Sequence, residues 1–186
     1  PGSSCDRDLA VAFEAAGAKV SMVWHKDTAL PEGVDIVGIP GGFSYGDYLR
    51  CGAIAANSPI CGEVAAHANR GGYVMGICNG FQVLVKTGLL PGGGAGRDRV
   101  TVTYNDSAKF EARWVKLEVC TDRCPFLTPV SEDARKGDPV YLELPVEHAE
   151  GKVVTAGDTV AAQLEAAGQV AVRYVDDDGD YDRYPA

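Results

Sequence analysis

One stretch of the sequence, Gly72-Tyr-Val-Met-Gly-Ile-Cys78-Asn-Gly-Phe-Gln82, decides the fold of this chain and directs attention to its chemistry. The apolar residues before Cys78 are typical of a buried strand, and the apolar spacing from Phe81 onward is typical of a helix. Glycines stand two residues before and two residues after Cys78, and they allow the backbone to turn sharply enough to expose the side chain between them. The sequence therefore predicts a strand, a tight turn that presents Cys78, and a helix.

The helix predicted after Cys78 has a consequence for the thiol. The first N–H groups of a helix point out of its N-terminus and carry about half a positive charge there. This environment favours the thiolate, which is the nucleophilic form of cysteine. The alternative is that Cys78, one of six cysteines, packs as a small hydrophobic residue. The flanking strand and helix favour the reactive interpretation.

The length and composition fit a single globular domain. With 186 residues, of which 46% are hydrophobic, the chain can bury a substantial core, and we expect a single domain over residues 1–186. A formal charge of −9 without a basic cluster argues against a nucleic-acid partner. No apolar run of about 18 residues predicts a membrane span, and the first residues lack a signal-peptide pattern.

The cysteines, at positions 5, 51, 61, 78, 120 and 124, lack the dense spacing of a secreted disulfide scaffold, so we expect a cytoplasmic location. Cys120 and Cys124 have no second pair with which to complete a zinc site, and the three histidines stand apart in the sequence, so we expect no metal. The acidic tail 176–182 resembles a calcium loop only in part, because the glutamate expected at its twelfth position is absent. A solvated turn is the simpler interpretation.

Helices and strands alternate in the first half. The patterns predict helices over 7–17 and 54–69, strands over 19–24 and 34–39, and the strand that ends at Cys78. This order indicates βαβ units and a three-layer α/β domain with a mostly parallel sheet. The second half predicts strands over 100–104, 112–120, 140–145 and 170–175 and a short helix over 160–167, which indicates a smaller antiparallel extension of the sheet.

Two glycine-rich loops follow parallel strands and should meet at one edge of the sheet. One contains Gly41, Gly42 and Phe43, and the other contains Cys78 and Asn79. A thiolate that attacks an amide carbonyl creates an oxyanion, which requires N–H donors about 3 Å away. The N–H of Asn79 and one from Gly42 or Phe43 are candidate donors. The pair of loops therefore predicts acyl transfer.

The same loops resemble those of the class I glutamine amidotransferases. The resemblance is carried by Ile39-Pro-Gly-Gly-Phe-Ser-Tyr-Gly-Asp-Tyr-Leu-Arg50, Gly76-Ile-Cys-Asn-Gly-Phe-Gln82 and Gly88-Leu-Leu-Pro-Gly92. It is closest to the family of glutaminase subunits of phosphoribosylformylglycinamidine synthase, of the separate small-subunit type found in bacteria and archaea. It continues in Pro1-Gly-Ser-Ser-Cys-Asp-Arg-Asp8, Val23-Trp-His25 and Leu144-Pro-Val-Glu-His-Ala-Glu-Gly151.

The resemblance implies a flavodoxin-like three-layer α/β/α fold and a glutaminase. Cys78 would form a cysteinyl thioester from L-glutamine, with Gly42, Phe43 and Asn79 in the oxyanion hole and Gln82 beside the substrate. Ammonia would pass to a large synthetase subunit, in a complex with a small accessory subunit, for purine biosynthesis. ATP and magnesium would belong to that partner, so we expect no cofactor in this chain.

The base that completes the chemistry is the main departure from the family. A cysteine nucleophile needs a histidine to move its proton, usually one oriented by a carboxylate. In the family these residues come from a His-Pro-Glu segment, which we expect beyond Ala186. We also expect an N-terminal strand before Pro1. His148 and Glu150 have similar spacing, but the family has a His-Gly-Glu stretch there as well as its catalytic pair. We therefore expect residues 1–186 alone to be weakly active or inactive.

Two other functions stay open from the sequence. The chain could be a non-catalytic amidotransferase-like binding subunit, as the absent His-Glu pair would suggest. It could also be a cysteine hydrolase or a redox protein of similar fold, although such proteins would share Cys78 and not the long match around Gly42.

Overall fold

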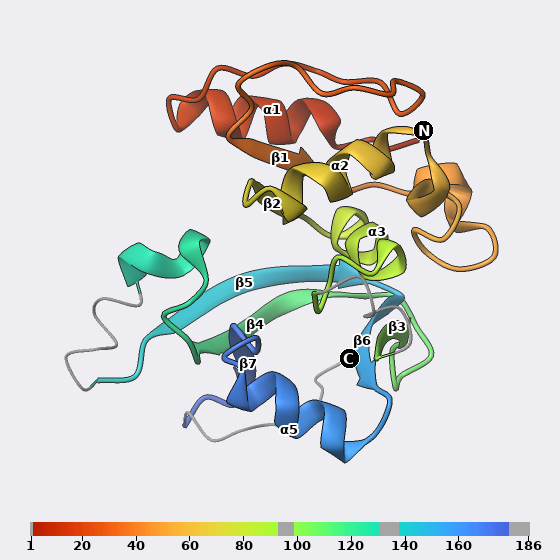
Figure 1. The fold of residues 1–186 in the computed structure, drawn as a ribbon. Coiled ribbons are helices and arrows are strands. Elements are labelled where there is room, and N and C mark those ends of the chain that lie inside the picture. Colours follow the sequence, from red (N-terminus) through yellow and green to blue (C-terminus); the bar gives the residue numbers. More distant parts are fainter. Residues whose placement is uncertain (1, 93–98, 131–137, 179–186) are drawn as a thin grey trace. The chain divides into compact units, whose positions relative to one another are not determined.

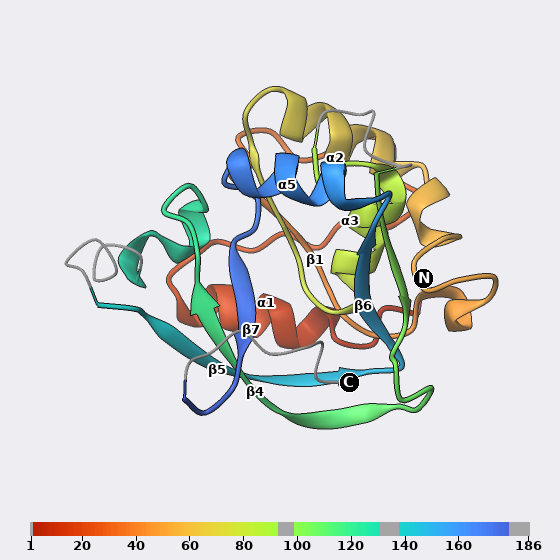
Figure 2. The ribbon, with the colours of Figure 1, turned by 90° about the horizontal axis from the view of Figure 1, so that it is seen from below.

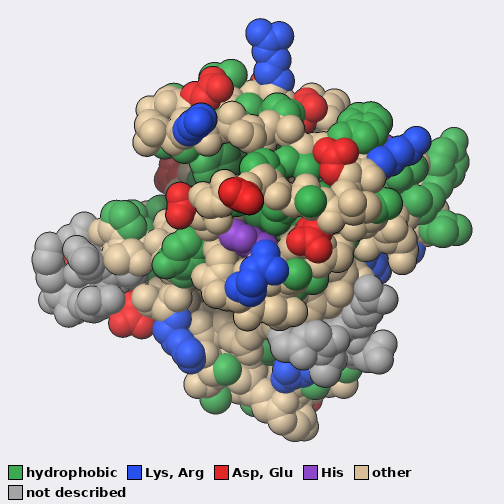
Figure 3. Space-filling view, turned by 45° about the horizontal axis from the view of Figure 1, so that its top comes forward, with side chains coloured by type: hydrophobic (Ala, Val, Ile, Leu, Met, Phe, Trp, Pro, Cys, Tyr) green, Lys and Arg blue, Asp and Glu red, His purple; other side chains and the backbone are tan. Residues whose placement is uncertain are grey.

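The computed structural model describes residues 2–92, 99–130 and 138–178 (Figure 1). The chain divides into two compact units, residues 1–98 and residues 99–186. The single domain expected over residues 1–186 stays a prediction. Within the described residues, no helix is both long enough and apolar enough to span a membrane. On the face that Figure 3 shows, acidic and basic side chains are interspersed.

The first unit contains a parallel pair of strands. Its elements, in order, are α1 (Asp6–Ala15), β1 (Ile36–Ile39), two short 3₁₀ helices (Ser44–Asp47 and Ala55–Asn57), α2 (Ile60–Asn69), β2 (Tyr73–Gly76) and α3 (Asn79–Thr87). β1 pairs with β2 in parallel, from Ile36 opposite Tyr73 to Ile39 opposite Gly76. The predicted βαβ arrangement is therefore present, because α2 lies between these strands in the sequence.

Helices cover both faces of this pair (Figure 1). A Cβ on Gly38 would contact the side chains of Leu9 and Phe13, so α1 lies on that face of β1. A Cβ on Gly76 would lie 2.7 Å from Leu84 Cδ1 of α3. Since Gly76 pairs with Ile39, the residue after Gly38, and successive residues of a strand face opposite sides, α1 and α3 cover opposite faces. The first unit is thus layered as helix, sheet and helix.

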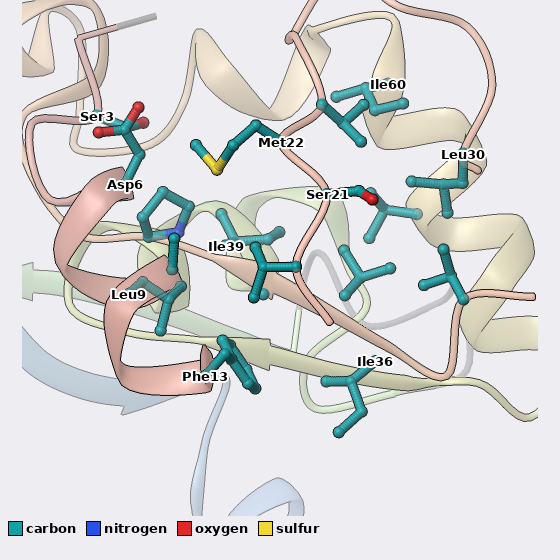
Figure 4. Close-up of a pocket in the computed structure, with 18 of the residues that line it drawn as sticks. Ser3, Asp6, Leu9, Phe13, Ser21, Met22, Leu30, Ile36, Ile39 and Ile60 are labelled. Carbon is teal, nitrogen blue, oxygen red and sulfur yellow. The ribbon is translucent and has the colours of Figure 1, made fainter. Parts of the chain in front are cut away.

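The prediction of a strand over 19–24 is wrong, because residues 18–24 have no regular secondary structure. A cleft of about 860 Å³ is lined by α1, by this segment and by β1. Figure 4 shows Leu9, Phe13, Met22 and Ile39 around it. At Trp24 the backbone N–H donates instead to the Asp27 carboxylate at 2.9 Å, which closes a turn. A segment held apart from β1 by a cleft cannot form the ladder that defines a strand.

The break inside the predicted helix 54–69 has a local cause. Residues 55–57 form a 3₁₀ turn, Ser58 is extended with ψ 143°, and α2 begins at Ile60. Pro59 follows Ser58, and the residue before a proline is disfavoured in the helical region. The proline then serves as the cap of α2.

The second unit is antiparallel, as predicted. It contains β3 (Val100–Tyr104), β4 (Glu111–Val119), a 3₁₀ turn (Pro125–Leu127), β5 (Tyr141–His148), β6 (Glu150–Thr155), α5 (Asp158–Ala166) and β7 (Val172–Val175). β4 lies between β5 and β7, and β3 pairs with β6 (Figure 2). Val102, Leu117 and Leu164 are among its buried apolar side chains. The strand β6 was not predicted, and the part of the acidic tail after residue 178 lies outside the described residues.

Candidate active site

Cys78 occupies the turn between β2 and α3, as the sequence predicts. Its backbone has φ 53° and ψ −113°, and α3 begins at the next residue. A positive φ is uncommon for a residue with a side chain and is retained where the surrounding structure enforces it. The Cys78 residue is exposed. The turn therefore presents a strained, accessible thiol at the N-terminus of a helix.

The two flanking glycines are required by close packing. A Cβ on Gly76 would lie 2.7 Å from the carbonyl oxygen of Gly80, within the turn itself. A Cβ on Gly80 would overlap the carbonyl group of Ile39 at the end of β1. The first turn of α3 can therefore lie directly on β1 only because Gly80 has no side chain.

The glycine-rich loop after β1 lies beside Cys78. Because Ile39 pairs with Gly76, the residues that follow each strand emerge at the same edge of the sheet. A Cβ on Gly41 would be 3.3 Å from the Cβ of Cys78 and 3.9 Å from the Cβ of Cys5. The predicted convergence of the two loops is present in the structure, and Cys5 is a neighbour that the sequence did not reveal.

Two backbone N–H groups act on the Cys78 sulfur, those of Asn79 and Gly42. Both lower the pKa of the thiol, since they stabilise the thiolate. Although the residue is exposed, the surrounding loops remove its sulfur partly from water, and this desolvation acts more strongly in the opposite direction. The nearby Cys5 and Asp47 add to it, so the pKa of Cys78 is raised above its ordinary value. This direction of the pKa shift is opposite to the one expected from the helix N-terminus alone.

The candidate oxyanion donors are not equally placed. The N–H of Phe43 donates to the carbonyl of Gly2 at 3.3 Å, and the Phe43 side chain is 61% exposed. Gly42, with φ 124°, presents its N–H to the Cys78 sulfur. The geometry therefore favours Gly42 and Asn79 as the pair of donors over Phe43.

Gln82, expected beside the substrate, lies one turn along α3 from Cys78. It is 7% exposed, and its N–H donates to the Cys78 carbonyl at 3.2 Å. Its side-chain oxygen accepts a hydrogen bond from the Asn79 amide at 2.9 Å. Gln82 therefore supports the turn from within α3.

The Asn79 side chain and Asp47 are site residues that sequence reasoning missed. Asn79 Nδ2 donates to Asp47 Oδ1 at 3.0 Å, and Asn79 Oδ1 accepts from the Ser44 N–H at 3.1 Å. Only the backbone of Asn79 was predicted to matter. The sequence signal was the polar Ser44 and Asp47 within the glycine-rich loop, but their partner was not evident without the fold.

The three histidines are held in separate environments. His25 Nδ1 lies 3.3 Å from the Tyr45 hydroxyl, and His67 is buried, with its ring against Gly72. In the second unit, His148 Nδ1 lies 2.9 Å from Asn105 Oδ1, and its ring packs where a Cβ of Gly151 would be. These contacts agree with a structural interpretation of His148.

The buried Glu150 lies in the same region of the second unit. It pairs with Tyr104 in the ladder between β3 and β6. Among the described residues, no group of three or more His, Cys, Asp or Glu is arranged to hold a metal ion.

Comparisons with known proteins identify the family of the chain. Residues 1–186 match the family described as the CobB/CobQ-like glutamine amidotransferase domain. The chain is 56% identical over 176 residues to the phosphoribosylformylglycinamidine synthase subunit PurQ of Roseobacter denitrificans. The match covers 95% of this chain and 72% of that protein. The corresponding subunit of Zymomonas mobilis is 44% identical over 177 residues, with 95% and 73% covered.

A solved structure is also similar. The structure of PurLQS from Thermotoga maritima includes a chain that matches with a TM-score of 0.75 and 36% identity, over 95% of this chain and 72% of that one. At this identity and coverage the likeness concerns both fold and family. It confirms the predicted α/β fold class.

Proposed function

Because the chain belongs to the glutamine amidotransferase family, among the PurQ subunits of phosphoribosylformylglycinamidine synthase, we propose that it hydrolyses L-glutamine at Cys78. The family acts in purine biosynthesis as the glutaminase subunit of a ligase complex. The roles of the individual residues are our proposal.

The reaction begins with attack of the Cys78 thiolate on the side-chain amide carbon of glutamine. The carbonyl oxygen becomes an oxyanion, which accepts hydrogen bonds from the N–H groups of Gly42 and Asn79. Collapse of this intermediate breaks the C–N bond, releases ammonia and leaves a thioester on Cys78. Water then attacks the thioester, releases glutamate and restores the thiol.

Proton transfer requires a further group. The proton that leaves the thiol must reach the departing ammonia, and the family resemblance assigns this transfer to a His-Glu pair. An imidazolium beside Cys78 would also offset the raised pKa of its thiol.

The ammonia is proposed to pass to a synthetase subunit. The similar Thermotoga maritima chain comes from a structure named PurLQS, which supports a complex with a large subunit and a small accessory subunit. ATP and magnesium are proposed to bind in the large subunit. The six free cysteines support a cytoplasmic location, where thiols stay reduced.

The observation that carries this proposal is the convergence of the Gly42 and Asn79 N–H groups on the Cys78 sulfur. The test is glutamate release by the full-length protein in complex with its synthetase partner. We expect turnover that Cys78→Ala abolishes, while synthesis from added ammonia persists. Turnover by the Cys78→Ala complex would refute the assignment.

One observation favours a second candidate, a non-catalytic subunit. The raised pKa of Cys78 is what a thiol without a catalytic task would also show. A diazoketone analogue of glutamine discriminates between the two functions, because it alkylates an activated thiolate in a glutamine site. Labelling of Cys78 that excess glutamine prevents supports the enzyme, and no labelling supports the non-catalytic subunit.

A further inference from the structure

The Asn79 side chain is the most deeply buried large polar group of the site. It is 1% exposed and lies in the first turn of α3, next to Cys78. A buried amide is tolerated when its donors and acceptor all have partners. The partners of this amide connect α3 to the loop that contains Gly42.

The hydrogen bonds of Asn79 use each part of its amide. Its Nδ2 donates to Asp47 Oδ1 at 3.0 Å and to Gln82 Oε1 at 2.9 Å, while its Oδ1 accepts from the Ser44 N–H at 3.1 Å. The Asp47 carboxylate can only accept a hydrogen bond, and the Ser44 N–H can only donate one. The Asn79 amide therefore has one allowed orientation, because exchanging its oxygen and nitrogen would place oxygen against the Asp47 oxygen and N–H against the Ser44 N–H.

The loop held by this amide has a conformation that would not persist alone. Three consecutive residues, Tyr45, Gly46 and Asp47, have φ of 54°, 63° and 54°. Left-handed conformations are unfavourable for residues with side chains and need support from surrounding contacts. Asn79 binds the loop at Ser44, the residue before the left-handed run, and at Asp47, the last residue of the run.

We propose that the Asn79 side chain and Asp47 are positioning residues that hold the Gly42–Asp47 loop in register with Cys78, so that the Gly42 N–H meets the oxyanion. This inference rests on the proposed glutaminase function. Asn79 combines two tasks in it. Its backbone N–H stabilises the oxyanion, and its side chain places the second donor.

The test reverses the polarity of the Asn79 to Asp47 hydrogen bond. In Asn79→Asp, two carboxylates face each other and the loop should be released. In Asp47→Asn, the new amide oxygen can still accept from Asn79. In the double variant, the amide at 47 donates to the carboxylate at 79, so the bond is restored with donor and acceptor exchanged and the net charge unchanged.

The expected pattern is specific. We expect Asn79→Asp to lower kcat of the full-length complex by about 100-fold, as for loss of an oxyanion donor, with KM changed much less. Asp47→Asn should stay within about 10-fold of wild type, and the double variant should recover at least about 10-fold over Asn79→Asp. A double variant no better than Asn79→Asp, or Asn79→Asp with wild-type kcat, would overturn the proposal.

Two controls separate positioning from a loss of folding. Asn57→Ala removes an amide that donates to the Ala53 carbonyl at 2.9 Å on an exposed turn of the same unit, and it should leave kcat unchanged. Thermal unfolding and synthesis from added ammonia are measured for every variant. If kcat per folded molecule of Asn79→Asp equals that of wild type, the role is merely structural and the proposal fails.

A readout that needs no glutaminase activity distinguishes failure of the two proposals. Iodoacetamide alkylation of Cys78, followed by peptide mass spectrometry, reports thiolate stabilisation by the Gly42 N–H. We expect Asn79→Asp to slow it and the double variant to restore it. If wild type releases no glutamate, the proposed function fails, and this alkylation series alone decides for or against the positioning role.

Discussion

Gly80 in the first turn of α3 lies directly against the carbonyl group of Ile39 at the end of β1, where a Cβ would overlap the oxygen. This contact joins the helix after Cys78 to the strand before the Gly42 loop. The two halves of the candidate site are therefore fixed to each other by backbone packing as well as by side chains.

We expect Gly80→Ala to destabilise the first unit by about 3 kcal/mol, because its methyl group must displace backbone atoms. Gly62→Ala is the matched control, since Gly62 is also helical and a Cβ there meets nothing within 4 Å. That control should stabilise by about 0.5–1 kcal/mol. Urea unfolding measures both, and equal free energies of unfolding would show that the contact is not as close as described.

Gly42→Ala should reduce glutamine hydrolysis by at least about 100-fold, because the new Cβ would overlap the Ser4 backbone and displace the donor N–H. Gly33→Ala separates this effect from the cost of a positive φ. Gly33 has φ 71°, yet a Cβ there has open space. Its alanine variant should be somewhat less stable but fully active. Similar kcat losses in both variants would count against Gly42 as a donor.

The alkylation of Cys78 in the chain of residues 1–186 should have a pH midpoint above that of free cysteine. Removal of the sulfur from water raises its pKa, and the negative charge of Asp47 acts in the same direction. Below this midpoint most molecules hold the unreactive thiol, so the rate should rise with pH. Peptide mapping separates Cys78 from the other five cysteines. A midpoint below that of free cysteine would show a thiolate already stabilised.

His148 should make the second unit less stable in mild acid. Burial lowers its pKa below the ordinary 6.5, so the unfolded chain binds the proton more readily than the fold does. The contribution of the neutral His148 ring to the free energy of unfolding is fully present above about pH 6.5. It is lost as the pH falls toward and through the lower pKa of the folded state. The difference in unfolding free energy between wild type and His148→Gln should therefore rise between pH 5 and 7. A flat difference would contradict the shift.

Asn105 is the partner that holds His148. It is 3% exposed, its Nδ2 donates to the carbonyls of His148 and Lys109 at 2.7 and 2.9 Å, and its Oδ1 faces His148 Nδ1. Asn105→Ala removes the hydrogen bonds to the two carbonyls and to the His148 ring. We expect the free energy of unfolding to fall by about 2–3 kcal/mol. Asn57→Ala, on an exposed turn, should lose less than about 1 kcal/mol in the same urea titration. Equal losses would argue against a buried network at His148.

The turn at Cys78 and the strands beside it were predictable because their signals are local. Glycine spacing and an apolar run specify a strand, a turn and a helix within a dozen residues. The segment 19–24 has the same apolar character, but a strand also needs a partner at hydrogen-bonding distance, which the sequence of one segment cannot supply. The strand β6 escaped prediction for the related reason that its pairing with β3 joins residues far apart in the sequence.

The candidate site divides in the same way. Cys78 and Gly42 carry recognisable backbone signatures, whereas the bond between Asn79 and Asp47 joins side chains 32 residues apart and depends on the fold. The thiol was expected to ionise readily because the helix N-terminus was weighed alone. Desolvation of the sulfur, which the sequence does not reveal, raises the pKa more than the N–H groups of Asn79 and Gly42 lower it.

The parallel register of β1 and β2 also limits how this protein can change in length. One residue inserted between Ile36 and Gly42 would advance the donor by about 3.3 Å, which is more than a hydrogen bond tolerates. The same holds between Tyr73 and Cys78. The coil of residues 28–33 lies between the His25 contact with Tyr45 and the ladder, and it can lengthen without moving either loop. Insertions and deletions among natural homologues should therefore collect in that coil and avoid both strand-to-loop intervals.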